Sequence, residues 1–74
     1  MAEYTINAQG LQCPAPIMRL FMKIKEALPG DEVVIEVTDV GFKSDIVAWC
    51  KKTNNELLSI TEADGIISAR IRKV

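Results

Sequence analysis

The segment Gly10-Leu11-Gln12-Cys13-Pro14-Ala15-Pro16 sets two prolines directly before an apolar-periodic run, and it constrains the fold more than any other stretch. A proline ring fixes φ near the helical value, and its missing amide hydrogen is not needed in the first turn of a helix. Because Ala15 precedes a proline, the helix is expected to begin at Pro14 or at Pro16. Either start leaves Cys13 at the N-terminal end of a helix.

The run that follows has the spacing of one face of an amphipathic helix over residues 17–28. The apolar positions that this helix is expected to bury are Ile17, Leu20, Phe21, Ile24, Ala27 and Leu28. Pro29-Gly30 supplies the stop signal. Met18 and Met22 lie beside the stripe, where we expect flexible packing side chains, with a partner-binding patch as the alternative.

The remaining elements follow from alternation and turn residues. A short strand is expected over residues 3–7, and a half-buried one over 32–38 with Val33, Ile35 and Val37 on its inner face. Ser44 is a candidate N-cap for a second helix over 45–53. The apolar side of that helix would be formed by Ile46, Val47, Trp49 and Cys50. Two further strands, 57–61 and 66–72, flank a tight turn at Ala63-Asp64-Gly65.

The expected element order is therefore β-α-β-α-β-β. Two amphipathic helices can cover one face of a four-stranded mixed sheet, which predicts an α+β fold of the two-layer sandwich type with its other face open to solvent. A chain of 74 residues is expected to form a single domain over 1–74 with a small core.

Composition excludes several kinds of chemistry. The chain has two cysteines and no histidine, so a Ser-His-Asp triad, a Cys-His pair and a histidine-ligated metal are all excluded, and no cofactor or metal is expected. A net charge of −1 with scattered basic residues argues against direct binding of nucleic acid. No apolar run is long enough to insert in a membrane, and no signal peptide is recognisable, so we expect a cytoplasmic protein.

Cys13 is the candidate reactive group. The positive end of the helix dipole and the free backbone amides there are expected to lower the pKa of its thiol. An exposed thiolate can accept a sulfane sulfur and hold it as a persulfide. On the residues alone, a small buried cysteine at a helix start is an equally good interpretation, because prolines also open purely structural helices.

Here the sequence resembles the TusA-like (SirA-like) sulfur carrier proteins over nearly its whole length. Their Cys-Pro-x-Pro motif is present as Cys13-Pro14-Ala15-Pro16 after Gly10-Leu11-Gln12. A second match comprises Thr38-Asp39, Asp45-Ile46 and Trp49-Cys50. The chain departs from the family pattern at Val40, where proline is common, and at Asn7, where many members have aspartate.

The resemblance implies a carrier of persulfide sulfur, with Cys13 as the carrier residue and Gly10, Pro14 and Pro16 as its supports. It implies a donor protein, either a cysteine desulfurase or a rhodanese-like protein, and an acceptor protein in tRNA thiolation, molybdoenzyme maturation or sulfur oxidation. Contact with a membrane thiosulfate transporter is implied for some relatives. Without a general base, the chain is expected to act as a carrier rather than as a stand-alone enzyme.

Cys50 is expected to be a buried structural residue, with a second redox thiol as the alternative. Asp39 and Asp45 are expected to serve as loop and cap residues, with partner orientation as the alternative. Arg19 and Lys23 are expected on a solvated face, or near enough to Cys13 to stabilise its thiolate.

Two other functions stay open at this point. One is a thiol redox switch that joins Cys13 and Cys50 in a reversible disulfide. The other is an RNA- or protein-binding module without sulfur chemistry, because the expected fold resembles the C-terminal domain of a bacterial translation initiation factor.

Overall fold

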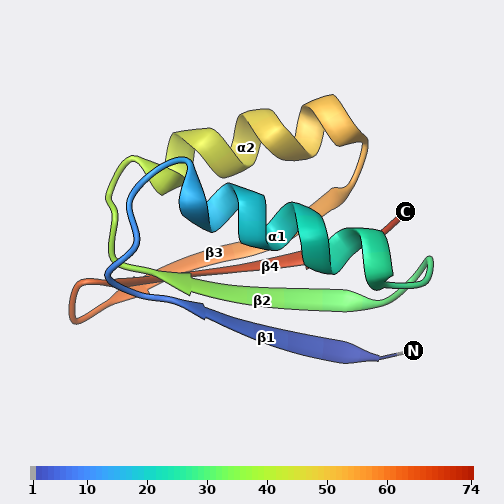
Figure 1. The fold of residues 1–74 in the computed structure, drawn as a ribbon, viewed down its shortest axis with the longest axis horizontal. Coiled ribbons are helices and arrows are strands. Elements are labelled where there is room, and N and C mark those ends of the chain that lie inside the picture. Colours follow the sequence, from blue (N-terminus) through green and yellow to red (C-terminus); the bar gives the residue numbers. More distant parts are fainter. Residues whose placement is uncertain (1) are drawn as a thin grey trace.

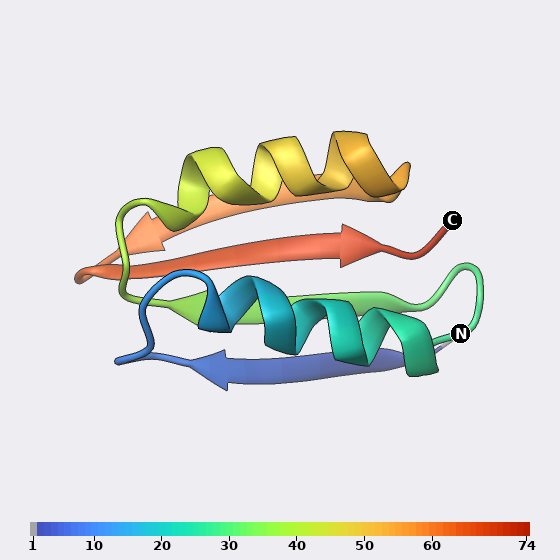
Figure 2. The same cartoon turned by 45° about the horizontal axis from the view of Figure 1, so that its top comes forward.

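A computed structural model describes residues 2–74 and has the predicted order of elements. The elements are β1 (Glu3–Ala8), α1 (Ala15–Glu26), β2 (Glu32–Val37), α2 (Phe42–Thr53), β3 (Glu56–Ala63) and β4 (Ile66–Arg72). The strands form one mixed sheet in the order β1-β2-β4-β3, with β1 parallel to β2 and the other two pairs antiparallel. Both helices lie on the same face of the sheet (Figures 1 and 2), which confirms the α+β two-layer sandwich.

The core lies between the helices and the inner face of the sheet. Val33, Ile35 and Val37 of β2 are completely buried, as their alternation predicted, and Ile67, Ala69 and Ile71 oppose them from β4. From the helices, the buried side chains are Pro16, Leu20 and Ile24 of α1 and Phe42, Ile46 and Cys50 of α2. Each helix therefore buries a single row of side chains spaced four residues apart.

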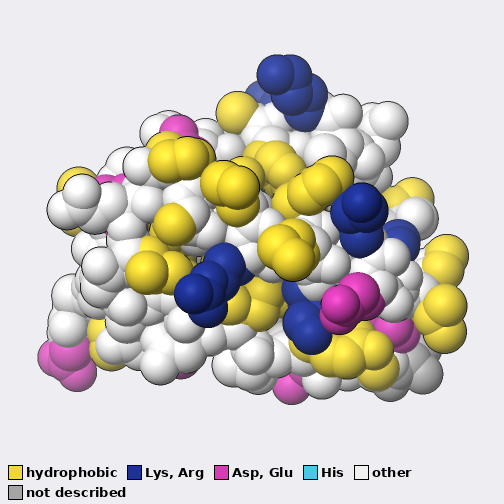
Figure 3. Space-filling view, in the orientation of Figure 1, with side chains coloured by type: hydrophobic (Ala, Val, Ile, Leu, Met, Phe, Trp, Pro, Cys, Tyr) yellow, Lys and Arg dark blue, Asp and Glu magenta, His cyan; other side chains and the backbone are white. Residues whose placement is uncertain are grey.

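The stripe predicted for the first helix was partly wrong. Phe21 is 47% exposed, and Leu28 is 68% exposed because the helix already ends at Glu26 and the chain is extended at Ala27. Met18 and Met22 are 60% and 66% exposed, so they are not packing residues. Met18, Phe21 and Met22 project from exposed parts of the α1 surface, and hydrophobic side chains gather over the helical layer (Figure 3).

The second helix begins three residues earlier than predicted. Gly41 is its N-cap and Phe42 its first residue, so Ser44 is not the cap; its hydroxyl instead donates to the Gly41 carbonyl at 3.2 Å. Val47 is 38% exposed and does not belong to the buried row. The helix ends as expected at Asn54, whose left-handed φ of 61° turns the chain so that the Asn55 amide also donates to the Cys50 carbonyl, at 3.1 Å.

The hairpin between β3 and β4 has Asp64 and Gly65 at φ 55° and 77°, as the Asp-Gly pair predicted. On the open face of the sheet, Arg70 pairs with Glu3 and Glu32, and Arg72 pairs with Glu32 and Glu56. These pairs join all four strands. Arg70 holds the pKa of Glu32 below its ordinary value.

The carboxylate of Asp31 joins the segments that precede β1 and β2. It accepts hydrogen bonds from the amides of Ala2 at 2.8 Å and Leu28 at 3.0 Å, and these bonds lower its pKa. Asp31 is only 3% exposed, so this end of the molecule is closed by a buried and fully bonded carboxylate.

Candidate functional site

Cys13 is exposed in the connection between β1 and α1. The helix begins at Ala15, with Pro14 at the N-cap and Pro16 in the first turn, so the sulfur lies just before the first turn, as the two prolines predicted. Gly10 turns the chain out of β1 with φ 81°, a conformation that L side chains rarely adopt, and its amide donates to Thr38 Oγ1 at 2.9 Å.

Asp39 joins the Cys13 loop to the connection between β2 and α2. Its Oδ2 accepts a hydrogen bond from the Cys13 amide at 3.1 Å, and its Oδ1 accepts one from the Gly41 amide at 3.1 Å. One carboxylate therefore holds two loops that are 26 residues apart in sequence. The expected loop role of Asp39 is confirmed, and its partner is the backbone of the candidate reactive residue.

Asp45 contacts the thiol itself. It lies in the first turn of α2, and its Oδ2 accepts a hydrogen bond from Cys13 Sγ at 3.1 Å. The thiol is thus the donor, which requires it to carry its proton. Two carboxylates flank Cys13, one at its amide and one at its sulfur.

The predicted lowering of the Cys13 pKa was wrong in direction. The hydrogen bond to Asp45 raises the pKa of this thiol above its ordinary value, assisted by desolvation and by the negative charges of Asp45 and Asp39. Position at a helix start favours the thiolate, but a carboxylate in direct contact favours the protonated form. At Cys13 the effect of the nearby carboxylates on the thiol pKa exceeds that of the helix start.

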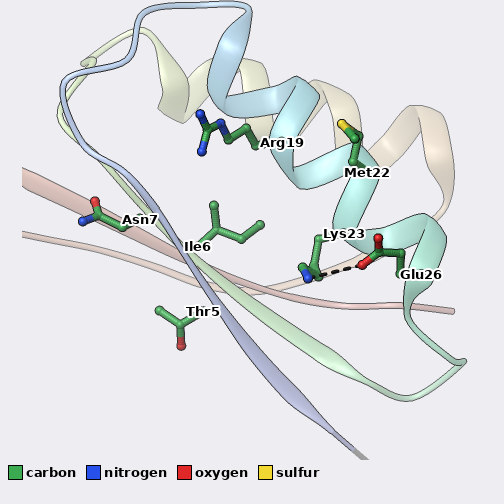
Figure 4. Close-up of a pocket in the computed structure, with 7 residues that line it drawn as sticks. All are labelled: Thr5, Ile6, Asn7, Arg19, Met22, Lys23 and Glu26. Carbon is green, nitrogen blue, oxygen red and sulfur yellow. Dashed lines mark hydrogen bonds and ion pairs between the residues drawn. The ribbon is translucent and has the colours of Figure 1, made fainter.

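Arg19 and Lys23 do not offset these charges by contact with the thiol. The Lys23 ammonium pairs with Glu26 at 3.3 Å and lies 5.2 Å from the centre of the Tyr4 ring. Arg19 lines a groove beside β1 (Figure 4). This placement favours the expected solvated basic face over the alternative, stabilisation of the Cys13 thiolate.

Two hollows adjoin the N-terminal half of the fold. The larger, about 540 Å³, is the groove between β1 and α1, lined by Thr5, Ile6, Asn7, Arg19, Met22, Lys23 and Glu26 (Figure 4). A smaller one of about 430 Å³ adjoins the residues that precede Cys13 and is lined by Gly10, Leu11, Gln12, Thr38, Asp39 and Val40. This smaller hollow therefore lies between the loop that leads to Cys13 and the loop that carries Asp39.

Cys50 lies in the core, 4% exposed, and burial raises the pKa of its thiol to about 11. This confirms the expected structural placement. Both cysteines are free. Cys50 is five residues beyond Asp45 on α2, about 7.5 Å farther along the helix axis, so the residue that contacts the Cys13 sulfur is well separated from it.

Within residues 2–74, no cluster of three or more Cys, Asp or Glu side chains is arranged to hold a metal ion. Neither helix in the same range is long and apolar enough to cross a bilayer.

Comparison with known proteins identifies the family. The family model described as Sulfurtransferase TusA matches residues 4–73. The chain belongs to the TusA family. Over 69 residues it is 35% identical to the sulfur carrier protein TusA of Pseudomonas fluorescens, covering 93% of this chain and 83% of the relative.

Other relatives include a putative sulfur carrier protein of Neisseria meningitidis, 34% identical over 68 residues that cover 92% of each chain. YrkF of Bacillus subtilis, also named a putative sulfur carrier, is 39% identical over 66 residues, or 89% of this chain. The match spans only 35% of YrkF. A SirA-like protein from Desulfitobacterium hafniense superposes with a TM-score of 0.84 over 93% of this chain and 95% of that one; at 24% identity it shows the shared fold.

Hydrogen bonds bring Gly10 and Cys13 together with Thr38, Asp39 and Asp45, whereas Cys50 is buried in the core. Sequence reasoning missed Thr38 as a partner of the Gly10 amide and gave both aspartates only loop, cap or partner-orienting roles. Their hydrogen bonds to Cys13 span 26 and 32 residues, and no local pattern indicates such pairings.

Proposed function

We propose that this chain is a sulfur carrier that accepts sulfane sulfur on Cys13, holds it as a persulfide and passes it to a partner protein. The observation that carries the proposal is the exposed thiol of Cys13 at the opening of α1 in a chain of the TusA family. The names of the relatives support the sulfur cargo. The placement of the thiol supports this residue as the one that holds it.

The transfer needs little from the chain itself. A donor persulfide R–S–SH and the Cys13 thiol exchange one sulfur: a new S–S bond forms to Cys13, the donor S–S bond breaks, and the donor leaves as R–SH with the proton that Cys13 gave up. No separate oxidant or reductant enters, because the sulfane sulfur moves between two thiols. Partner proteins, a desulfurase or rhodanese-like donor and an acceptor, supply the remaining chemistry.

We include in the proposal that residues 1–74 act as one carrier domain in the cytoplasm. Gly10 and Pro14 support the loop conformation that exposes the sulfur, and Pro16 supports the helix start behind it. Cys50 has a packing role, because its side chain is in the core.

Neither alternative gains support from the geometry. A Cys13–Cys50 disulfide would need the core residue Cys50 to leave its packed position. Nucleic-acid binding on the open sheet face would need free cations, whereas Arg70 and Arg72 there are paired with glutamates.

The test is intact mass spectrometry after incubation with a cysteine desulfurase and cysteine. Wild type should gain the mass of one sulfur atom, Cys13→Ser should gain nothing, and Cys50→Ser should behave as wild type. An adduct that survives Cys13→Ser, or that never forms in wild type, would overturn the proposal. Mild oxidation gives the complementary result: loss of two hydrogens would favour the redox switch.

A further inference from the structure

The charge around the Cys13 sulfur is negative, although its place at a helix start suggests the opposite. The sulfur donates to the Asp45 carboxylate at 3.1 Å, and the amide of the same residue donates to the Asp39 carboxylate at 3.1 Å. These two groups come from α2 and from the connection before it. Both are outside the loop that carries the cysteine.

Two basic side chains of the surrounding elements are paired with glutamates, and a third lies beside β1. Lys43 of α2 pairs with Glu62 of β3, and Lys23 of α1 pairs with Glu26. Arg19 of α1 lines the groove beside β1. The groups that contact Cys13 from the elements packed against it are therefore the two carboxylates.

We propose that Asp45 and Asp39 are specificity-determining residues that make Cys13 a poor acceptor for small anionic sulfur donors such as thiosulfate and select a sulfane sulfur presented by a protein. This inference rests on the proposed carrier function. Thiosulfate must bring two negative charges to a residue with one carboxylate at its sulfur and another at its amide, and a free dianion has no other contact to offset that repulsion. A protein donor can also contact the chain away from the thiol, for which the exposed Met18, Phe21 and Met22 of α1 are available.

Both reactions balance in the same way. With thiosulfate, the Cys13 thiolate attacks the outer sulfur, an S–S bond forms to Cys13, the S–S bond of thiosulfate breaks, and sulfite leaves with the bonding electron pair. The thiol proton passes to solvent. The two donors thus differ in the charge that they bring to the site and not in the bond that is made.

The raised pKa of the Cys13 thiol is consistent with this assignment, because the same carboxylates that repel an incoming anion also disfavour the thiolate. Neutralising the charge of either aspartate should therefore weaken the repulsion of an incoming anion and lower the pKa of the Cys13 thiol together.

The first test needs no sulfur transfer. The rates of Cys13 alkylation by neutral iodoacetamide and by anionic iodoacetate are measured in a Cys50→Ser background, and their ratio isolates the effect of local charge. Asp45→Asn should lower the iodoacetamide-to-iodoacetate ratio about fourfold at low salt, the effect of one unit charge near 5 Å in water. Added salt should shrink this change.

Glu26→Gln is the matched control, since it removes the same charge about 16 Å away along α1. Asp39→Asn should act like Asp45→Asn, with circular dichroism to check that the fold is kept. An equal ratio in wild type, Asp45→Asn and Glu26→Gln would overturn the inference.

The second test compares persulfide formation from thiosulfate with that from a desulfurase and cysteine, by intact mass over time. Asp45→Asn should speed the thiosulfate reaction about 16-fold, the square of the fourfold effect on a single charge, because the repelled ion carries two charges. Its effect on the desulfurase reaction should be much smaller. Equal effects on both donors would overturn the inference but leave the carrier function standing. The absence of an adduct from any donor would overturn the carrier function, and the alkylation ratio could still be measured.

Discussion

The two thiols of this chain occupy opposite environments on neighbouring elements. Cys13 is exposed just before α1, and its sulfur donates a hydrogen bond to the Asp45 carboxylate. Cys50 is buried on α2 among apolar side chains. Both pKa values are raised, but for different reasons: a hydrogen bond and negative charge at Cys13, and loss of water at Cys50. A raised pKa alone therefore says nothing about function, whereas exposure and contacts do.

The largest expected difference between the thiols is in accessibility. Iodoacetamide should label Cys13 in the folded protein and reach Cys50 only through unfolding. For a fold stable by about 5 kcal/mol, this makes Cys50 react more than a thousandfold more slowly. Peptide mass spectrometry after timed alkylation measures both rates, and urea should bring them together. Comparable rates without urea would contradict the buried placement of Cys50.

Truncation should separate the thiols by stability. Cys50→Ala leaves a gap in the core and should lower the free energy of unfolding by about 1–2 kcal/mol. Cys13→Ala removes an exposed group and should stay within about 0.5 kcal/mol of wild type. Urea denaturation followed by circular dichroism measures both. A larger loss of unfolding free energy in Cys13→Ala than in Cys50→Ala would contradict the placement of Cys13 at the surface and of Cys50 in the core.

Gly10→Ala tests the loop that exposes Cys13. No atom lies within 4 Å of where its Cβ would be, so the cost comes from the φ of 81° alone. We expect a loss of about 1 kcal/mol in unfolding free energy. The alkylation rate of Cys13 should also change, because the turn positions its loop, while Cys50 should remain protected. Unchanged stability would mean that this φ is not needed.

Alkaline pH should reveal the burial of Cys50 through stability. Its folded-state pKa of about 11 lies above the value of about 8.5 for an unfolded chain, so the unfolded state loses this proton first. The stability that Cys50 contributes is present below pH 8.5 and is lost as pH rises toward 11. The urea midpoints of Cys13→Ser and of the Cys13→Ser, Cys50→Ala double variant should therefore converge over this range. A constant difference would contradict the pKa shift.

Much of the fold followed from local patterns. The β4 bounds matched because strict alternation follows an Asp-Gly turn. The β2 bounds matched to within one residue because a similar alternation follows Pro29-Gly30. The start of α2 did not, because Gly41 and Phe42 carry no conventional start signal, and Phe42 enters the helix by being buried against the core. Phe21 was misassigned because helical spacing alone does not tell how wide a face the sheet covers.

The candidate site was predictable in part. Prolines placed Cys13 correctly, since their effect on the backbone is local. The electrostatics of its thiol were not predictable, because they depend on Asp39 and Asp45, which only the paired ends of β1 and β2 bring to the loop. A short-range rule, the helix dipole, was correct in itself and was outweighed by a contact across the fold.

The hydrogen bond from Cys13 to Asp45 joins residues 32 positions apart, so it exists only while the chain is folded. In the unfolded chain the same sulfur has no carboxylate beside it and reacts as any cysteine does. Unfolding would therefore remove the charge repulsion at Cys13 and let its thiol react with small anionic reagents. The rate at which Cys13 reacts with small anionic reagents should therefore also report the fraction of molecules that are folded.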